Sequence, residues 1–143
     1  MAYKSIQAWK QQNQVLTATP SGAGTAEVVL VDGLIIIDVN GLASSETLTI
    51  NTPWDFEIYD VWVITKKGGE VSPSTVTIKN NTTAITNSLN TIATKAIVRA
   101  TTIDDTEAAF NAGDDDLMVV RGAQAAGDFM IYIKTGPQMS TNA

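Results

Sequence analysis

The stretch that decides the fold is Trp54-Asp-Phe-Glu-Ile-Tyr-Asp-Val-Trp-Val-Ile-Thr65, which holds two of the three tryptophans in the chain. Aromatic and β-branched side chains lose rotamer freedom in a helix, so this stretch is predicted to be a β-strand. Its first half has one wet face, whereas its second half is apolar on both faces, as in a strand that enters the middle of a sandwich. With a period of two, the predicted core face carries Trp54, Phe56, Ile58, Trp62 and Ile64, and only Asp60 interrupts it.

The composition limits the chemistry that the chain can carry. Its 143 residues include no cysteine and no histidine, which excludes disulfides, thiolate metal sites and histidine-based catalysis. The net charge of −6 argues against binding to nucleic acid, which needs a clustered basic surface. We find no apolar run long enough to cross a membrane and no apolar core of a secretory signal near the start. We therefore expect a protein that is made in a cytoplasm, without a nucleic-acid or membrane partner.

The chain is predicted to have three parts. Residues 1–24 are an extended N-terminal arm, residues 25–135 are the β-sandwich domain, and residues 136–143 are a short polar tail. The arm is mildly basic and rich in glutamine, and its apolar anchors are spaced three apart, so we predict that it docks on a neighbouring surface. A frayed terminus is the other interpretation. The anchors that we expect to make this contact are Tyr3, Ile6 and Trp9.

Short apolar runs separated by turn residues follow the arm. Two β-branched runs flank Asp32-Gly33, which predicts a tight hairpin with positive φ at both turn residues. The spacing changes between Thr86 and Ile97, where four apolar residues recur at helical intervals and predict one short helix. The sequence therefore predicts an all-β fold, an antiparallel β-sandwich of jelly-roll type with one helix. The four helix positions are Leu89, Ile92, Ala93 and Ala96.

Carboxylates are the main candidates for site chemistry. Asp114-Asp115-Asp116, with Asp104 and Asp105, can supply oxygen ligands for calcium, although no EF-hand spacing is present and a solvated turn is the alternative. We find no nucleophile elbow, phosphate-binding loop or zinc motif, so we predict no catalytic residue, no cofactor and no enzyme. Trp54 and Trp62 can form a sugar platform, but their place on the predicted core face favours packing.

Three segments of the sandwich region resemble a pattern found in small virion proteins of tailed phages. Their order is an aromatic strand, a turn-rich hairpin, a short helix and a glycine-aspartate hairpin, as in head decoration, or capsid cement, proteins. The resemblance covers residues 45–134; it departs at the three consecutive aspartates and does not match the arm. The segments are Trp54 to Ile64, Thr75-Val-Thr-Ile-Lys79 with Ala84-Ile-Thr86, and Ala112-Gly-Asp114 with Leu117-Met-Val-Val120.

The resemblance implies a β-sandwich that binds the outer surface of an icosahedral phage capsid and stabilises it, usually as a homotrimer. The partner is then the major capsid protein, and the place of work is the virion. The arm lies outside the resemblance, but a long arm suits exchange between sister subunits or insertion between capsid proteins, so we expect Tyr3, Ile6 and Trp9 to make these contacts. The alternative is a receptor- or glycan-binding head module of a virion fibre. Exposed aromatic residues in loops would favour that alternative, whereas most aromatic residues outside the arm lie in predicted strands.

Overall fold

The computed structural model describes residues 16–43, 45–67, 74–91, 93–123 and 127–138. Within these ranges the chain contains strands in two antiparallel sheets and no helix, so the prediction of an all-β sandwich is confirmed at this level. The strands are β1 (Ala18–Pro20), β2 (Thr25–Val31), β3 (Leu34–Leu42), β4 (Thr47–Ile50), β5 (Phe56–Lys67), β6 (Ser74–Asn80), β7 (Thr83–Ala84), β8 (Leu89–Asn90), β9 (Ile97–Arg99), β10 (Ala109–Phe110), β11 (Leu117–Ala123) and β12 (Gly127–Gly136).

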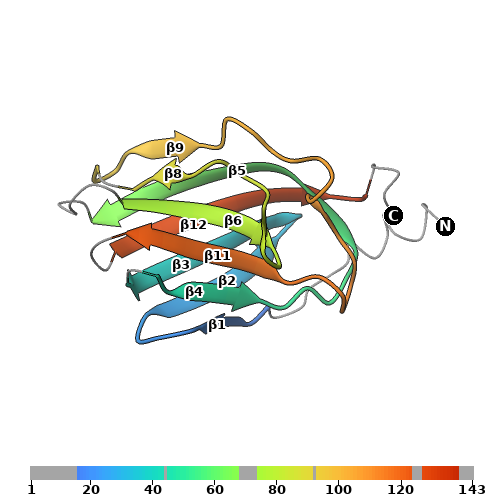
Figure 1. Ribbon diagram of the computed structural model, residues 1–143, viewed down its shortest axis with the longest axis horizontal. Helices are drawn as coiled ribbons and strands as arrows, with labels where there is room; N and C mark the ends of the chain where they lie inside the picture. The colour runs from blue at the N-terminus through green and yellow to red at the C-terminus, as the bar shows by residue number, and fades with distance from the viewer. Residues whose placement is uncertain (1–15, 44, 68–73, 92, 124–126, 139–143) are drawn as a thin grey trace.

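The strands form two layers, which lie one behind the other in the view of Figure 1. The first layer, sheet A, has the order β1-β4-β11-β6-β7, and β8 also pairs with β6. The second layer, sheet B, has the order β10-β5-β12-β3-β2, and β9 also pairs with β5. From β3 to β6 the chain crosses to the other sheet at every connection, and it does so again from β10 through β12. Each sheet is therefore built from segments that are far apart in the sequence.

The hydrophobic core fills the space between the two sheets. Phe56 of β5 and Phe110 of β10 stack there with ring centroids 4.8 Å apart and an interplanar angle of 2°. Ile78 of β6 and Ile131 of β12 are also fully buried in the same cluster. Offset-stacked rings of this kind add to the free energy gained from burying their area.

The predicted hairpin between β2 and β3 is confirmed. Val31 pairs with Leu34, which leaves a two-residue turn at Asp32 and Gly33. Their φ angles are 50° and 81°, so both lie in the left-handed region that a type I′ turn requires. The Thr135 backbone N–H donates to the carbonyl of Gly33 over 2.9 Å, which ties this turn to β12.

The predicted helix over residues 86–97 is wrong. Leu89 is fully buried because β8 pairs with β6, whereas Ala93, which helical spacing would place on the same face, is exposed. The Asn87 side chain accepts a hydrogen bond from the backbone N–H of Thr101 over 2.9 Å instead of capping a helix. Asparagine and threonine have weak helix propensity, so pairing with sheet A outweighs the apolar spacing.

Strand β5 changes the face that it buries half-way along its length. Phe56 and Ile58 point into the core, and the rule of alternation would also turn residue 60 inward. Instead, Ile58 pairs with Thr135 and Asp60 pairs with Lys134, so Tyr59 is an extra residue opposite a regular strand. Such a β-bulge moves every later side chain to the opposite face.

The bulge corrects the predicted core face of β5. After it, Val61 and Val63 are buried, while Trp62 and Ile64 lie half-buried on the outer face of sheet B. The prediction is confirmed for Trp54, which is buried, and it is wrong for Trp62 and Ile64. The bulge is fixed by close packing, because a Cβ at Gly136 would lie 2.5 Å from a ring carbon of Tyr59.

The described part of residues 1–24 lies against the sheets. Strand β1 pairs with β4, and Leu16 just before it is buried. The backbone N–H of Gly24 donates to a carboxylate oxygen of the buried Glu46 over 3.2 Å, which fixes the link before β2. The predicted contact residues Tyr3, Ile6 and Trp9 fall outside the described residues, as does the end of the predicted tail after Gln138.

Candidate functional site

The candidate site lies on the outer face of sheet B, where the bulge has turned Trp62 outward. Trp62 of β5 pairs across the strands with Tyr132 of β12 on one side and with Arg99 of β9 on the other. Its indole and the Tyr132 ring stack with centroids 5.4 Å apart and an interplanar angle of 5°. This contact holds the indole in one orientation while it remains only half-buried.

An ion pair borders the indole. The carboxylate of Asp60 accepts two hydrogen bonds from Arg99, one from Nη2 and one from Nε at 3.1 Å. The side chain of Asp60 is 15% exposed and that of Arg99 is 72% exposed, so the carboxylate is largely buried while the guanidinium is open to solvent. Hydrogen bonding to Arg99 lowers the pKa of Asp60, and the same bond raises the pKa of Arg99. Asp60 is therefore ionised at neutral pH and fixes the guanidinium plane.

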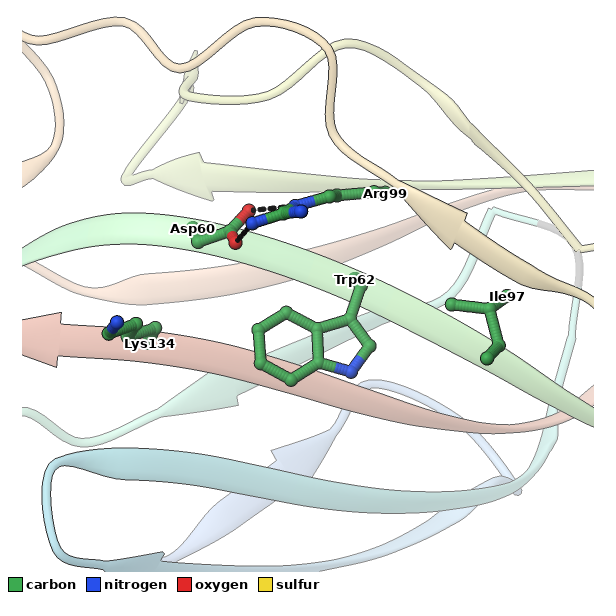
Figure 2. Close-up of a pocket in the computed structure, with 5 residues that line it drawn as sticks. All are labelled: Asp60, Trp62, Ile97, Arg99 and Lys134. Carbon is green, nitrogen blue, oxygen red and sulfur yellow. Dashed lines mark hydrogen bonds and ion pairs between the residues drawn. The ribbon is translucent and has the colours of Figure 1, made fainter.

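These groups surround an open hollow of about 350 Å³, which we call the Trp62 hollow; it is lined by Asp60, Trp62, Ile97, Arg99 and Lys134. Figure 2 shows the indole between Lys134 and Ile97, with the Asp60–Arg99 pair along one side. Ile97 is 68% exposed and, with the half-buried indole of Trp62, gives the hollow an apolar part. The volume lies at the lower end of the range of about 300–1,000 Å³ that is typical of small-molecule sites.

The Trp62 hollow has a local charge opposite to that of the chain. Arg99 and Lys134 contribute two positive charges and Asp60 one negative charge, whereas the whole chain carries −6. An aromatic face beside a fixed guanidinium and a lysine can bind a flat or ring-shaped ligand that bears an anionic group. The residues provide no nucleophile with an adjacent general base, so this geometry supports binding rather than a reaction.

A second exposed region, at the opposite edge of sheet B, has a different character. Strand β2 is an edge strand in the described part of the chain, and its outward-facing Val29 and Val31 are 51% and 55% exposed. Beside it, Leu16 and Ala18 line a hollow of about 420 Å³ between β1 and β2. We call Val29, Val31 and this hollow the β2 edge. Its charged neighbours are Glu27, which lines the hollow, and Asp38, which pairs across the strands with Glu27 and forms an ion pair with Lys66.

The acidic turn proposed for calcium has a structural role. One carboxylate oxygen of Asp115 accepts a hydrogen bond from the Asn111 backbone N–H over 2.8 Å, and the other accepts one from the Asn81 side chain. Asp104 accepts hydrogen bonds from the backbone of Thr106, which is a local turn contact. Among the described residues, no three carboxylates are grouped so that they can hold a metal ion.

The predictions from the sequence did not include a buried cation, Arg121. Arg121 of β11 is fully buried, its Nη1 donates to the Thr91 hydroxyl over 2.6 Å, and its guanidinium carbon lies 5.0 Å from the centroid of the Phe129 ring. These contacts offset the cost of removing the charge from water. Alternation along β11 places residue 121 inward with Leu117 and Val119, and this is the signal that could have found it.

Comparison with known proteins adds no assignment. No protein-family model matches the sequence, and no curated protein matches it. Within the ranges that the structure describes, no helix has the length and apolar character needed to span a membrane.

Proposed function

We propose that this chain is a structural virion protein that binds the outer surface of a phage capsid and stabilises it as a homotrimer. The observation that carries the proposal is the β2 edge, where two large apolar side chains are exposed to solvent on an edge strand close to Leu16. The sequence resemblance to head decoration proteins supports the same conclusion. The partner is the major capsid protein, and the place of action is the capsid exterior.

The physical reason lies in what an exposed edge strand does. Edge strands of monomeric proteins are normally protected by charged residues, because their free backbone groups can pair with another chain. Here the outward position of Glu27 is charged, but the next two outward positions of β2 are Val29 and Val31, and both valines are more than half exposed. Burying them against a neighbour returns the free energy of apolar burial, at roughly 25 cal/mol for each Å² removed from water. Three linked copies can then act together on one capsid surface, since the second and third contacts are intramolecular.

The same proposal includes jelly-roll topology for the sandwich. It is supported by the order β3-β12-β5-β9 in one sheet and β4-β11-β6-β8 in the other. In chain order these eight strands form two four-stranded sheets, with the last strands inserted between the earlier ones. This arrangement is common among virion proteins and needs no catalytic site.

A capsid-binding experiment tests the proposal. Particles lacking the protein are mixed with the purified chain and pelleted, and the bound fraction is measured. We expect the parent to co-sediment, and the double variant Val29→Lys/Val31→Lys to lose at least about tenfold in affinity because two charges must be desolvated. The matched control is Thr83→Lys/Ala84→Lys, which adds the same charge to the exposed edge strand β7 of sheet A. Equal binding by both double variants, or a parent that stays monomeric and unbound, would contradict the proposal.

The second candidate function is a receptor- or glycan-binding head module of a virion fibre. The observation that favours it is the outward position of Trp62, an aromatic side chain beside a fixed ion pair at the surface. Packing in the core had been the reason to set this interpretation aside, and the bulge in β5 removes that reason. Retention on immobilised host-cell envelope that depends on Trp62 tests this candidate.

A further inference from the structure

We propose that the Trp62 hollow binds an acidic saccharide, with the indole stacked on one sugar ring and with Arg99 and Lys134 holding its carboxylate or sulfate group. The inference rests on the second candidate function and names its ligand class. It concerns the purified chain alone, so it can be tested separately from capsid binding at the β2 edge.

The first step is the aromatic contact. One face of a pyranose ring presents C–H bonds with partial positive charge, and the face of an indole is negative, so the two attract on stacking. Tyr132 already holds the indole of Trp62 at a centroid distance of 5.4 Å, and the ligand therefore does not have to order this side chain. Ile97, 68% exposed at the edge of the hollow, supplies an apolar wall for the rim of the same ring.

The second step is recognition of the anionic group. An arginine carries five N–H donors, and Arg99 uses two of them in its hydrogen bonds to Asp60. The Arg99 side chain is largely exposed to solvent, so a ligand can reach the other donors. Since the ion pair fixes the guanidinium plane, its remaining edge is preorganised for a carboxylate or sulfate. Lys134 pairs across the strands with Asp60 and lines the same hollow, so it adds a second charge on the side of the indole away from Ile97.

The charge balance selects an acidic ligand over a neutral one. The chain as a whole carries a charge of −6 and therefore repels an anionic ligand. The Trp62 hollow has one net positive charge, and this local charge attracts the anion. A neutral sugar would gain the stacking contact but would leave both cations without a new partner. Binding is therefore expected to weaken as salt screens the charges.

Affinity electrophoresis of the purified full-length chain tests the inference. The gels contain polygalacturonate as the carboxylated probe, heparin as the sulfated probe or dextran as the neutral control. We expect at least one acidic polysaccharide to retard the chain, dextran to leave its mobility unchanged, and added salt to reduce the retardation. Absence of retardation by both acidic polysaccharides, or equal retardation by dextran, overturns the inference.

Variants locate the site. Trp62→Ala is expected to abolish the retardation, and Trp62→Phe, which keeps an aromatic face, to retain part of it. Arg99→Gln and Lys134→Gln are each expected to weaken binding about tenfold, the effect of losing one hydrogen bond to a charged group. The matched control is Lys66→Gln. Lys66 is on β5, the strand of Trp62, but it forms an ion pair with Asp38 and does not line the hollow. Equal losses in Lys66→Gln and Arg99→Gln would place binding elsewhere, and thermal unfolding of each variant separates loss of fold from loss of the site.

Discussion

The two halves of strand β5 have similar sequences and opposite positions. Before Tyr59 the aromatic and aliphatic side chains enter the core, where Phe56 stacks on Phe110. After Asp60 the valines Val61 and Val63 enter the core, whereas Trp62 lies on the outer face and stacks on Tyr132 beside a charged pair. One inserted residue therefore separates an aromatic ring that stabilises the core, Phe56, from an aromatic ring that is available to a ligand, Trp62. Apolar content alone therefore does not distinguish a core strand from a binding surface.

The largest expected effect separates the two halves by stability. Phe56→Ala is expected to lower the free energy of unfolding by about 3–5 kcal/mol, because it removes a fully buried ring. Trp62→Ala is expected to cost less, about 1–3 kcal/mol, because it removes the stacking contact with Tyr132 and the burial of only part of a ring. Urea unfolding of both variants measures the difference. Equal losses would mean that Trp62 supports the fold as Phe56 does, and the comparison between the halves would fail.

A smaller effect is expected from removing the inserted residue itself. Deletion of Tyr59 leaves Ile58 facing inward and Asp60 facing outward, which is regular alternation, so the sandwich and the outward position of Trp62 are expected to persist. The hydrogen bond from the Tyr59 hydroxyl to the Pro137 carbonyl is lost, at a cost of about 0.5–1.5 kcal/mol. Tryptophan fluorescence and urea unfolding report the two quantities. A blue-shifted, buried Trp62 in the deletion variant would show that the bulge does not set the faces in this way.

The smallest effect concerns the ion pair in the outward half. Because Arg99 lowers the pKa of Asp60 in the folded state, the pair contributes stability above the unfolded value of about 3.9, and this contribution is lost as the pH falls through the folded pKa. Asp60→Asn is therefore expected to be less stable than the parent at neutral pH, with a difference that shrinks in acid. Urea midpoints of parent and variant, compared from neutral to acidic pH, give this difference. A gap that widens in acid would contradict the assignment.

Local signals in the sequence predicted most of the fold. The hairpin at Asp32-Gly33 was predictable because positive φ at both turn residues limits the choice of residues there. The helix prediction failed because four apolar residues at helical spacing do not specify what they pack against. Leu89 lies instead in β8, which pairs with β6. Pairing between strands that are distant in the sequence depends on the whole sandwich, so it cannot be predicted from one short stretch of residues.

The candidate site was only partly visible in the sequence. Asp60 interrupted the predicted core face of β5, and this was the one sign that the alternation changes there. Arg99 and Lys134 could not be placed beside Trp62, because they come from β9 and β12 and meet β5 only through strand order. The role of Tyr3, Ile6 and Trp9 stays a prediction, since these residues lie outside the described ranges.

The position of β12 has a consequence for how the protein is made. This strand is synthesised after every other strand of the described sandwich, yet it lies between β3 and β5 and pairs with both along most of its length. Sheet B therefore has a gap at its centre until residues 127–136 have left the ribosome, and the earlier strands wait with apolar surface uncovered. Contacts between such distant segments also slow folding. The chain is thus expected to fold only after synthesis of β12, and a nascent chain that stalls before residue 127 is a substrate for chaperones or proteases.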